Sequence, residues 1–248
     1  EVEASLRKAL LDAPQGALAI TPSTSLTGTA GLGKTTLATW LALDAEVQSF
    51  FADGVFWLRF GQEATALARL QELAGALGLP INEQMRDVQS AVAALQARLS
   101  GAGTHHLIIL DDVWVKEQVA PFKQLCNGGT IALVLTTRLK ELAQRFGQSQ
   151  ALAPLDEARA RSMLARCLQR PEAELEADAD FRKLVRRRCG LPIMLESLAS
   201  MCSGEQTPGD VLRELEAAGA DMEKLEVPAG GDYEHDDFFG GLEVQLRR

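Results

Sequence analysis

The sequence predicts an α/β fold in which helices cover both faces of a parallel sheet, followed by an all-α helical domain. Two patterns carry this prediction. Short apolar runs of the kind found in buried strands alternate with helically periodic segments as far as residue 153. Beyond Pro154 only helical periodicity remains. We therefore predict a sheet domain over 1–153, a helical domain over 154–217, and a linker leading toward a further domain over 218–248.

Five segments are expected to form the strands of the sheet. They lie within 17–26 and over 54–60, 107–112, 130–135 and 150–152. The first segment is polar for a buried central strand, and Pro22 within it has no N–H to give to a ladder. Helices are expected over about 1–11, 37–47, 64–77, 83–99, 117–125, 139–146, 156–168, 172–188, 191–202 and 208–217.

Composition excludes several classes of protein. The formal net charge of −9 argues against nucleic-acid binding and against binding to acidic membranes by this segment. The 4 cysteines lack CxxC spacing and the chain has only 3 histidines, which indicates neither a zinc site nor a disulfide framework. A reducing cytoplasm is therefore the expected location. No apolar run approaches the length of a membrane span.

A glycine-rich segment at 27–36 organises the sheet domain. It fits the phosphate-loop pattern of a glycine, four residues and Gly-Lys-Thr, which joins the first strand and helix of a P-loop NTPase sheet. Glycines leave the backbone N–H groups free to face a phosphate. Lys34 would reach the β- and γ-phosphates, and the Thr35 hydroxyl would ligate Mg²⁺. The nucleotide-binding residues predicted here are Gly28, Thr29, Ala30, Gly31, Leu32, Gly33, Lys34, Thr35 and Thr36. The alternative is a glycine-rich turn with an unrelated lysine.

Two adjacent carboxylates end the apolar run at 107–112. We expect this strand to lie beside the strand that precedes the glycine-rich loop. Asp111 would then ligate Mg²⁺ directly or through water, next to Thr35. Asp112 would lie near the γ-phosphate and orient or deprotonate an attacking water. The alternative is a strand that merely ends in an Asp-Asp turn.

A third apolar strand ends in Thr136-Thr137-Arg138. In a doubly wound sheet, residues that contact ligands collect at the carboxyl ends of strands. We therefore predict that Thr137 and Arg138 contact the nucleotide and sense its γ-phosphate. Arg138 could instead be an ordinary residue at a helix start. With Lys34 and Asp112, Arg138 completes the predicted catalytic set.

Five motifs follow one another along the chain. They are the glycine-rich loop GTAGLGKTT at 28–36, DGVFW at 53–57, LIILDDVW at 107–114, TTR at 136–138 and CGLPI at 189–193. In this order they resemble the NB-ARC group of STAND ATPases, which includes apoptosome scaffolds, plant disease-resistance receptors and bacterial regulators. The resemblance covers roughly residues 1–217.

The resemblance implies a molecular switch that binds ATP or ADP with Mg²⁺ and hydrolyses ATP slowly. Its ADP form would be closed, and the ATP form would self-associate. By resemblance, Pro192 packs against the base or sugar of the nucleotide. Such proteins carry an effector domain before this core and a sensor array after it, and we expect both to lie outside this chain. The residues 218–248 would begin a winged-helix domain, although His235 does not sit in that domain's histidine motif.

One element of the family pattern is missing, and two other functions compete with the switch. A Gly-Arg element expected ahead of the first helix is missing, so no base contact is transferred from it. A small-molecule kinase would need an acceptor pocket and an arginine-rich lid, and the helical half shows no such polar cluster. A nucleotide-free interaction module is disfavoured by the intact set of Lys34, Thr35, Asp111 and Asp112.

Overall fold

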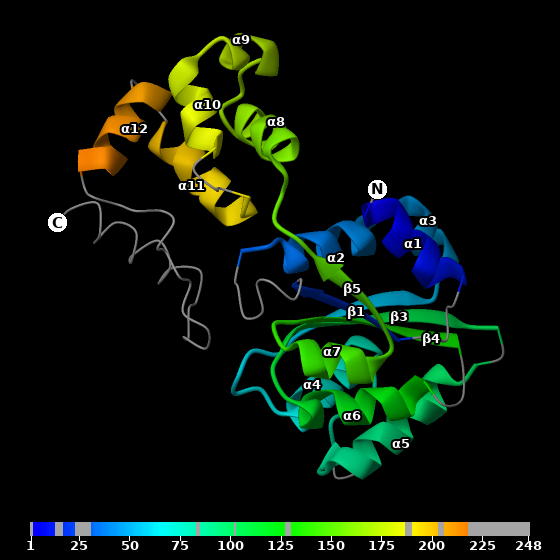
Figure 1. Cartoon of the computed structure of the whole chain (residues 1–248). Coiled ribbons are helices and arrows are strands. Elements are labelled where there is room, and N and C mark those ends of the chain that lie inside the picture. Colours follow the sequence, from blue (N-terminus) through cyan, green and yellow to red (C-terminus); the bar gives the residue numbers. More distant parts are fainter. Residues whose placement is uncertain are drawn as a thin grey trace. The chain divides into compact units, whose positions relative to one another are not determined.

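The computed structural model divides the chain into two compact units, which are described one at a time (Figure 1). The first unit comprises Glu1–Thr27 and Lys34–Leu152, and the second comprises Gly28–Gly33 and Ala153–Arg248. Only the backbone is described for 17–22, Thr130 and 215–217. The segments that the structure describes are 2–12, 17–22, 31–82, 85–101, 103–126, 130–186, 190–202 and 206–217.

The first unit is built on a five-stranded parallel sheet whose strand order is β2-β3-β4-β1-β5. This confirms the predicted parallel α/β sheet. The strands are β1 (Ala17–Pro22), β2 (Gly54–Arg59), β3 (His105–Val113), β4 (Thr130–Thr137) and β5 (Gln148–Leu152).

Helices cover both faces of this sheet (Figure 1). One face carries α1 (Val2–Asp12), α2 (Lys34–Leu43) and α3 (Ala45–Phe50). The other carries α4 (Ala66–Ala76), α5 (Val88–Leu99), α6 (Lys116–Leu125) and α7 (Lys140–Phe146).

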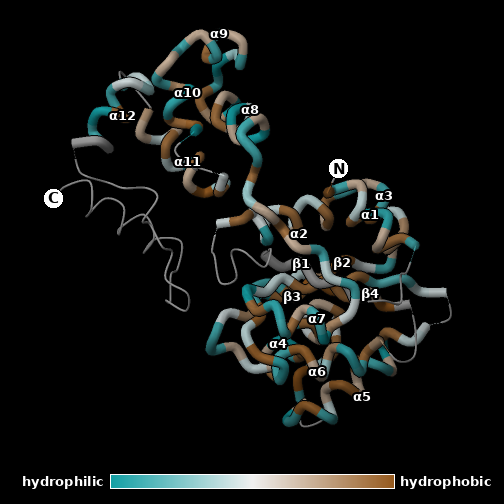
Figure 2. Tube along the Cα trace, in the orientation of Figure 1, coloured by the Kyte–Doolittle hydropathy of each residue, from teal (hydrophilic) through white to brown (hydrophobic). Residues whose placement is uncertain are grey.

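The side chains of β3 alternate between the two cores. Leu107 and Ile109 pack into the core beneath α1–α3, whereas Ile108 and Leu110 pack into the core beneath α4–α7. All four are fully buried, as a central strand covered on both faces requires. Figure 2 shows that hydrophobic and hydrophilic residues are both present along the helices, as expected for helices with one face on a core.

The strand that precedes the glycine-rich loop is central and short. β1 pairs with β4 on one side and β5 on the other. It ends at Pro22, so the missing N–H of that proline falls at the last residue of the strand rather than inside it. The polar stretch that made this segment unusual therefore begins where the strand ends, and 23–30 lie outside the described residues.

The expectation that β3 lies beside β1 is wrong. β4 lies between them, and β1 and β3 share no pairing. The carboxylates at the end of β3 are nevertheless within reach of the first turn of α2, because α2 crosses the sheet and contacts β1, β4 and β3. The helix, and not strand adjacency, brings the two predicted motifs together.

Three predicted helices begin or break at an aspartate. The expected helix over 37–47 is divided at Asp44, whose Oδ1 accepts the backbone N–H groups of Glu46 (3.0 Å) and Val47 (3.1 Å). Asp87 starts α5 later than predicted, and Asp178 divides the helix expected over 172–188. Aspartate favours such N-caps because its carboxylate satisfies N–H groups that have no partner inside the helix.

The second unit is entirely helical within the described residues. Its core is formed by α8, α10, α11 and α12 around the buried Phe181. None of the helices among the described residues has both the length and the apolar character of a membrane span. The helices are α8 (Glu157–Cys167), α9 (Glu172–Glu176), α10 (Ala179–Arg186), α11 (Pro192–Met201) and α12 (Pro208–Ala217).

The Gly-Leu-Pro turn at the start of α11 has a structural reason within this unit. The backbone of Leu155 passes close to Gly190, and Leu155 donates its N–H to the Gly190 carbonyl at 2.7 Å. A Cβ on Gly190 would lie 2.7 Å from the Leu155 oxygen, so no larger residue fits. Pro192 occupies the first turn of α11, where a missing N–H costs nothing.

Replacement of Asp44 tests whether the aspartate cap decides the break between α2 and α3. Asp44→Ala removes the cap and the ion pair of Asp44 with Arg7 (3.1 Å), and we expect the free energy of unfolding to fall by about 1–2 kcal/mol. Asp44→Asn keeps a capping oxygen and should lose less than half as much. Urea unfolding of both variants is the measurement, and equal losses would contradict the capping argument.

Candidate functional site

A bulge in β3 shapes the site at the carboxyl edge of the sheet. Leu110 pairs with Leu135, but the next pair is Val113 with Thr137, so β3 carries one residue more than β4 over this step. The extra length falls at Asp111-Asp112, and Asp112 adopts a left-handed φ of 55°. Bulges of this kind redirect side chains and are enriched beside active sites. The two adjacent carboxylates therefore do not simply alternate across the sheet.

The carboxylate of Asp111 is buried and held by two hydroxyl groups. Its Oδ1 accepts hydrogen bonds from Thr35 Oγ1 at 2.9 Å and from Thr136 Oγ1 at 2.6 Å. Asp111 is only 2% exposed. Because Thr35 lies on α2 and Thr136 on β4, this carboxylate joins three separate elements of the first unit.

Asp112 has a different environment from its neighbour. Its backbone N–H donates to Thr136 Oγ1 at 2.9 Å, and its backbone oxygen accepts from Gly61 N–H at 3.0 Å. Its side chain is partly exposed and lies 3.9 Å from Arg138 Nε. The Arg138 guanidinium in turn lies over the indole ring of Trp114, 4.9 Å from the ring centroid.

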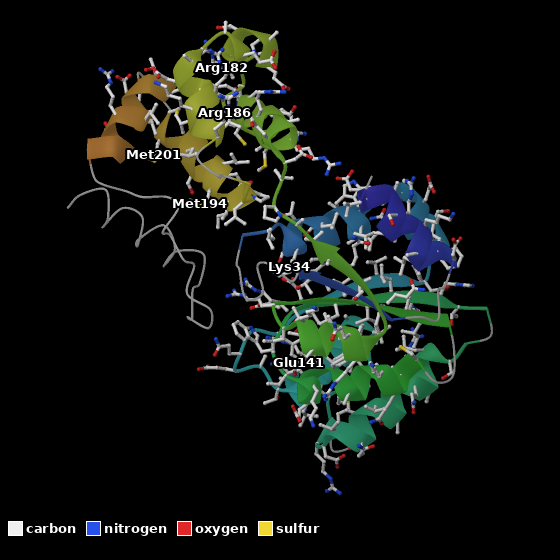
Figure 3. All side chains as sticks on the ribbon, in the orientation of Figure 1. Lys34, Glu141, Arg182, Arg186, Met194 and Met201 are labelled. Carbon is white, nitrogen blue, oxygen red and sulfur yellow. The ribbon has the colours of Figure 1, made fainter. Side chains whose placement is uncertain are left out.

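Lys34 is the first residue of α2 and is buried beside these groups (labelled in Figure 3). Burial and, to a smaller extent, the positive charge of Arg138 lower the pKa of Lys34, which is about 8. The carboxylates of Asp112 and Asp111 act in the opposite direction. An anion arriving beside Lys34 would favour its charged form and restore a higher pKa.

The two threonines at the end of β4 face opposite sides of the sheet. The structure brings Thr136, rather than the predicted Thr137, to the carboxylates. Thr137 is fully buried, donates to the Val113 carbonyl at 2.7 Å and accepts from Leu139 N–H at 3.1 Å. Adjacent strand residues point to opposite faces, so only one of the two hydroxyls could reach the site. A nucleotide contact by Thr137 therefore finds no support in this geometry.

Gln118 was missed by sequence reasoning. It lies in the first turn of α6, is only 3% exposed, and its carboxamide contacts the backbone of two loops, one after β3 and one after β2. A glutamine three residues after a helix start resembles half of a capping box. The preceding Val115 has no side-chain oxygen to complete that pattern, so the sequence carried no clear signal.

The described part of the glycine-rich loop is grouped with the second unit. Gly31 and Gly33 both have a φ of 80°, which side chains disfavour. Ile193 donates its N–H to the Gly31 carbonyl at 3.4 Å, and a Cβ on Gly31 would lie 2.1 Å from Ile193 Cγ2. Pro192 Cγ lies 3.9 Å from the position of a Cβ on Gly33.

The remaining loop predictions divide between described and undescribed residues. Leu32 is buried, whereas Thr36 is exposed on α2. A contact of Pro192 with a nucleotide base or sugar stays a prediction. Three predicted nucleotide-binding residues lie outside the described residues, namely Gly28, Thr29 and Ala30.

The residues present fit a magnesium ion. Mg²⁺ usually binds one or two carboxylates, substrate phosphates and water rather than a protein cage. Adjacent ligands of an octahedral ion at about 2.0–2.1 Å lie roughly 2.9 Å apart. The Thr35 hydroxyl and the Asp111 carboxylate oxygen have this separation, 2.9 Å. No cluster of three or more acidic, histidine or cysteine side chains that could hold a metal occurs among the described residues.

Solved structures show the class to which the fold belongs. The Aeropyrum pernix ORC2 protein in ADPNP-ADP complexes aligns with this chain with a TM-score of 0.58 at 16% identity. The alignment covers 91% of this chain and 70% of the ORC2 chain. A Signal Transduction ATPase with Numerous Domains (STAND) protein with a tetratricopeptide repeat sensor from Pyrococcus horikoshii aligns over 88% of this chain and 32% of its own, with a TM-score of 0.50 at 18% identity. The sheet and its site thus define a P-loop ATPase fold.

The chain belongs to the NB-ARC family. The model of the NB-ARC domain matches residues 8–158. The chain is similar to probable disease resistance protein RF45 of Arabidopsis thaliana, at 28% identity over 80% of this chain. It is 26% identical to putative disease resistance RPP13-like protein 1 of the same plant over 71% of this chain. It spans about a fifth of the length of these relatives, 20% and 18%.

The lowered pKa of Lys34 predicts a measurable titration. The side chain of Lys34 in isotope-labelled protein should titrate near 8 rather than at the ordinary value of 10.5. Arg138→Leu should raise this pKa because it removes a nearby positive charge, and Asp112→Asn should lower it. NMR titration of the three proteins, with Lys34→Arg to assign the signal, is the measurement. An unchanged pKa in both variants would contradict the electrostatic coupling.

Proposed function

We propose that this chain is the nucleotide-binding core of a molecular switch that binds ATP or ADP with Mg²⁺ and hydrolyses ATP slowly. One observation carries this proposal: the Asp111 carboxylate is held between the Thr35 and Thr136 hydroxyls beside the buried Lys34. A buried lysine next to a hydroxyl and a carboxylate at a helix start suits an anionic ligand that arrives with a divalent cation.

Each side chain has a role in this proposal. Lys34 binds phosphate oxygens, and Thr35 and Asp111 hold the Mg²⁺. When bound, the ion would offset negative charge on the phosphates. Asp112, which is partly exposed, orients the attacking water and accepts its proton. Arg138 lies within reach of Asp112 and senses whether a γ-phosphate is present.

The regulatory part of the proposal rests on the similarity of this chain to other proteins. Membership of the NB-ARC family, similarity to disease resistance proteins and a shared fold with a STAND protein support a signalling switch. We propose that the nucleotide controls self-association and that the protein acts in the cytoplasm. Such a switch requires a ligand whose affinity differs between two arrangements of the protein. We propose that effector and sensor functions lie outside this chain, which spans 20% of the length of the relative RF45.

The basic residues of the helical unit do not favour a kinase. Arg186, labelled on α10 in Figure 3, pairs with Glu157 at 3.2 Å. Arg161 pairs with Glu172 at 2.9 Å and with Glu176. These described arginines are therefore engaged within the unit and do not form a free cationic lid.

Replacement of Lys34 tests the phosphate contact. Lys34→Ala should lose about 1.5–3 kcal/mol of binding free energy for Mg-ATP, which is roughly a 10- to 150-fold weaker affinity, because a charge-assisted bond is removed. Lys116→Ala is the matched control, since Lys116 is largely exposed and contacts only its neighbour Glu117 among the described ion pairs. Titration with a fluorescent ATP analogue is the measurement. Equal affinity in both folded variants would exclude the proposed phosphate site.

Substitutions of Asp111 and Asp112 should differ in their effects on nucleotide binding and on hydrolysis. Asp111→Asn removes a metal ligand and should weaken Mg-dependent nucleotide binding. Asp112→Asn should bind Mg-ATP within about threefold of the parent but hydrolyse it at least tenfold more slowly, because water positioning matters mainly in the transition state. Single-turnover hydrolysis and binding titrations on both variants are the measurements. A similar loss of affinity in both would contradict this division of roles.

A further inference from the structure

The buried carboxamide of Gln118 joins two loops at the carboxyl edge of the sheet. Gln118 Oε1 accepts the backbone N–H groups of Trp114 (2.8 Å) and Val115 (3.3 Å), which follow β3. Its Nε2 donates to the backbone oxygens of Gly61 (2.8 Å) and Ala64 (3.1 Å), which follow β2. All four bonds are to backbone, and the side chain is 3% exposed.

Only half of this arrangement is needed to start a helix. The acceptor Oε1 satisfies N–H groups at the beginning of α6, as a cap does. The donor Nε2 contributes nothing to the cap, because it reaches carbonyl groups more than 50 residues earlier in the sequence. The donor therefore has a separate consequence, which is to hold the loop after β2 against the loop after β3.

The loop after β2 contacts the backbone of Asp112, the residue whose carboxylate is the candidate catalytic group. Gly61, whose carbonyl accepts from Gln118, donates its own N–H to the Asp112 carbonyl at 3.0 Å. Gly61 and Asp112 both adopt left-handed φ angles, 71° and 55°. A non-glycine residue in this conformation is unfavourable unless its surroundings hold it. Gln118 thus acts on the Asp112 backbone through a single intervening residue.

The loop after β3 touches the candidate sensor. Gln118 accepts the N–H of Trp114, and the indole ring of Trp114 lies under the Arg138 guanidinium. Arg138 Nε lies 3.9 Å from Asp112 Oδ1. The same carboxamide therefore braces both members of the Asp112–Arg138 pair, one from each side.

We propose that Gln118 is a positioning residue. Through Gly61 and Trp114 it holds Asp112 and Arg138 in the relative positions that ATP hydrolysis needs. This inference rests on the proposed function of the site. Lys34, Thr35 and Asp111 are held by α2, β3 and β4, so nucleotide binding does not depend on the Gln118 carboxamide. Its loss should consequently affect turnover more than affinity.

A conservative substitution separates the two halves of the carboxamide. Gln118→Glu keeps the acceptor that caps α6 but places a carboxylate oxygen against the Gly61 and Ala64 carbonyls. The matched control is Gln96→Glu, because Gln96 Nε2 likewise donates to backbone, in its case to the oxygen of Gln124 at the end of α6 (2.7 Å). Both variants lose a side-chain amide donor that bonds to backbone, from the buried Gln118 within α6 and from the half-buried Gln96 beside the end of α6.

We expect Gln118→Glu to lower kcat for ATP by about tenfold or more, since small displacements of catalytic groups have effects of this size. Its Kd for Mg-ADP should stay within about twofold of the parent. Gln96→Glu should show no such loss of kcat.

Several results would overturn the inference. If folded Gln118→Glu has the kcat of the parent, or if Gln96→Glu loses as much kcat, then Gln118 only caps α6 and has no positioning role. If the parent protein itself binds Mg-ATP without hydrolysing it, the proposed hydrolysis fails, and amide hydrogen exchange decides the positioning role separately. Exchange in 111–115 should then be faster in Gln118→Glu than in the parent and in Gln96→Glu, and unchanged exchange would exclude the role.

Discussion

The first unit depends on the burial of one negative charge. A carboxylate that is 2% exposed is costly unless hydrogen bonds and a nearby positive charge compensate it. Asp111 receives both: hydroxyl groups from α2 and β4 donate to it, and the burial of Lys34 places a cation beside it. Three elements that are far apart in the sequence must therefore meet at one oxygen atom. The same requirement that stabilises the fold assembles the site.

The bulge in β3 gives the two adjacent aspartates, Asp111 and Asp112, different environments. In a regular strand, Asp111 and Asp112 would point to opposite faces and share little. The extra residue instead turns the Asp112 backbone into a left-handed conformation, in which a threonine side chain and Gly61 satisfy its N–H and C=O groups. Asp111 stays buried among hydroxyls, while Asp112 remains partly exposed beside Arg138. Environment, rather than residue type, separates the metal-binding role proposed for Asp111 from the water-orienting role proposed for Asp112.

The charge balance of the site suits the nucleotide proposed to bind there. Two cations, Lys34 and Arg138, face two carboxylates, so the protein groups are formally neutral together. The cations disfavour each other, which is one reason why the pKa of Lys34 is lowered. Phosphate oxygens would relieve this repulsion, and a divalent ion would offset their remaining charge against Asp111. The charges of the site thus suit a phosphate-bearing ligand that binds together with a divalent metal ion.

The sequence by itself determined the elements of the fold and singled out most residues of the candidate site, because these depend on local patterns. Apolar runs and helical periodicity specified the strands and helices, and glycine spacing singled out Lys34 and Thr35. Tertiary structure alone decided that β4 separates β1 from β3, that Thr136 and not Thr137 faces the carboxylates, and that Gln118 braces both loops. Strand order, the side to which a bulged strand turns and the partner of a buried amide all depend on contacts between distant residues. No single stretch of sequence encodes them.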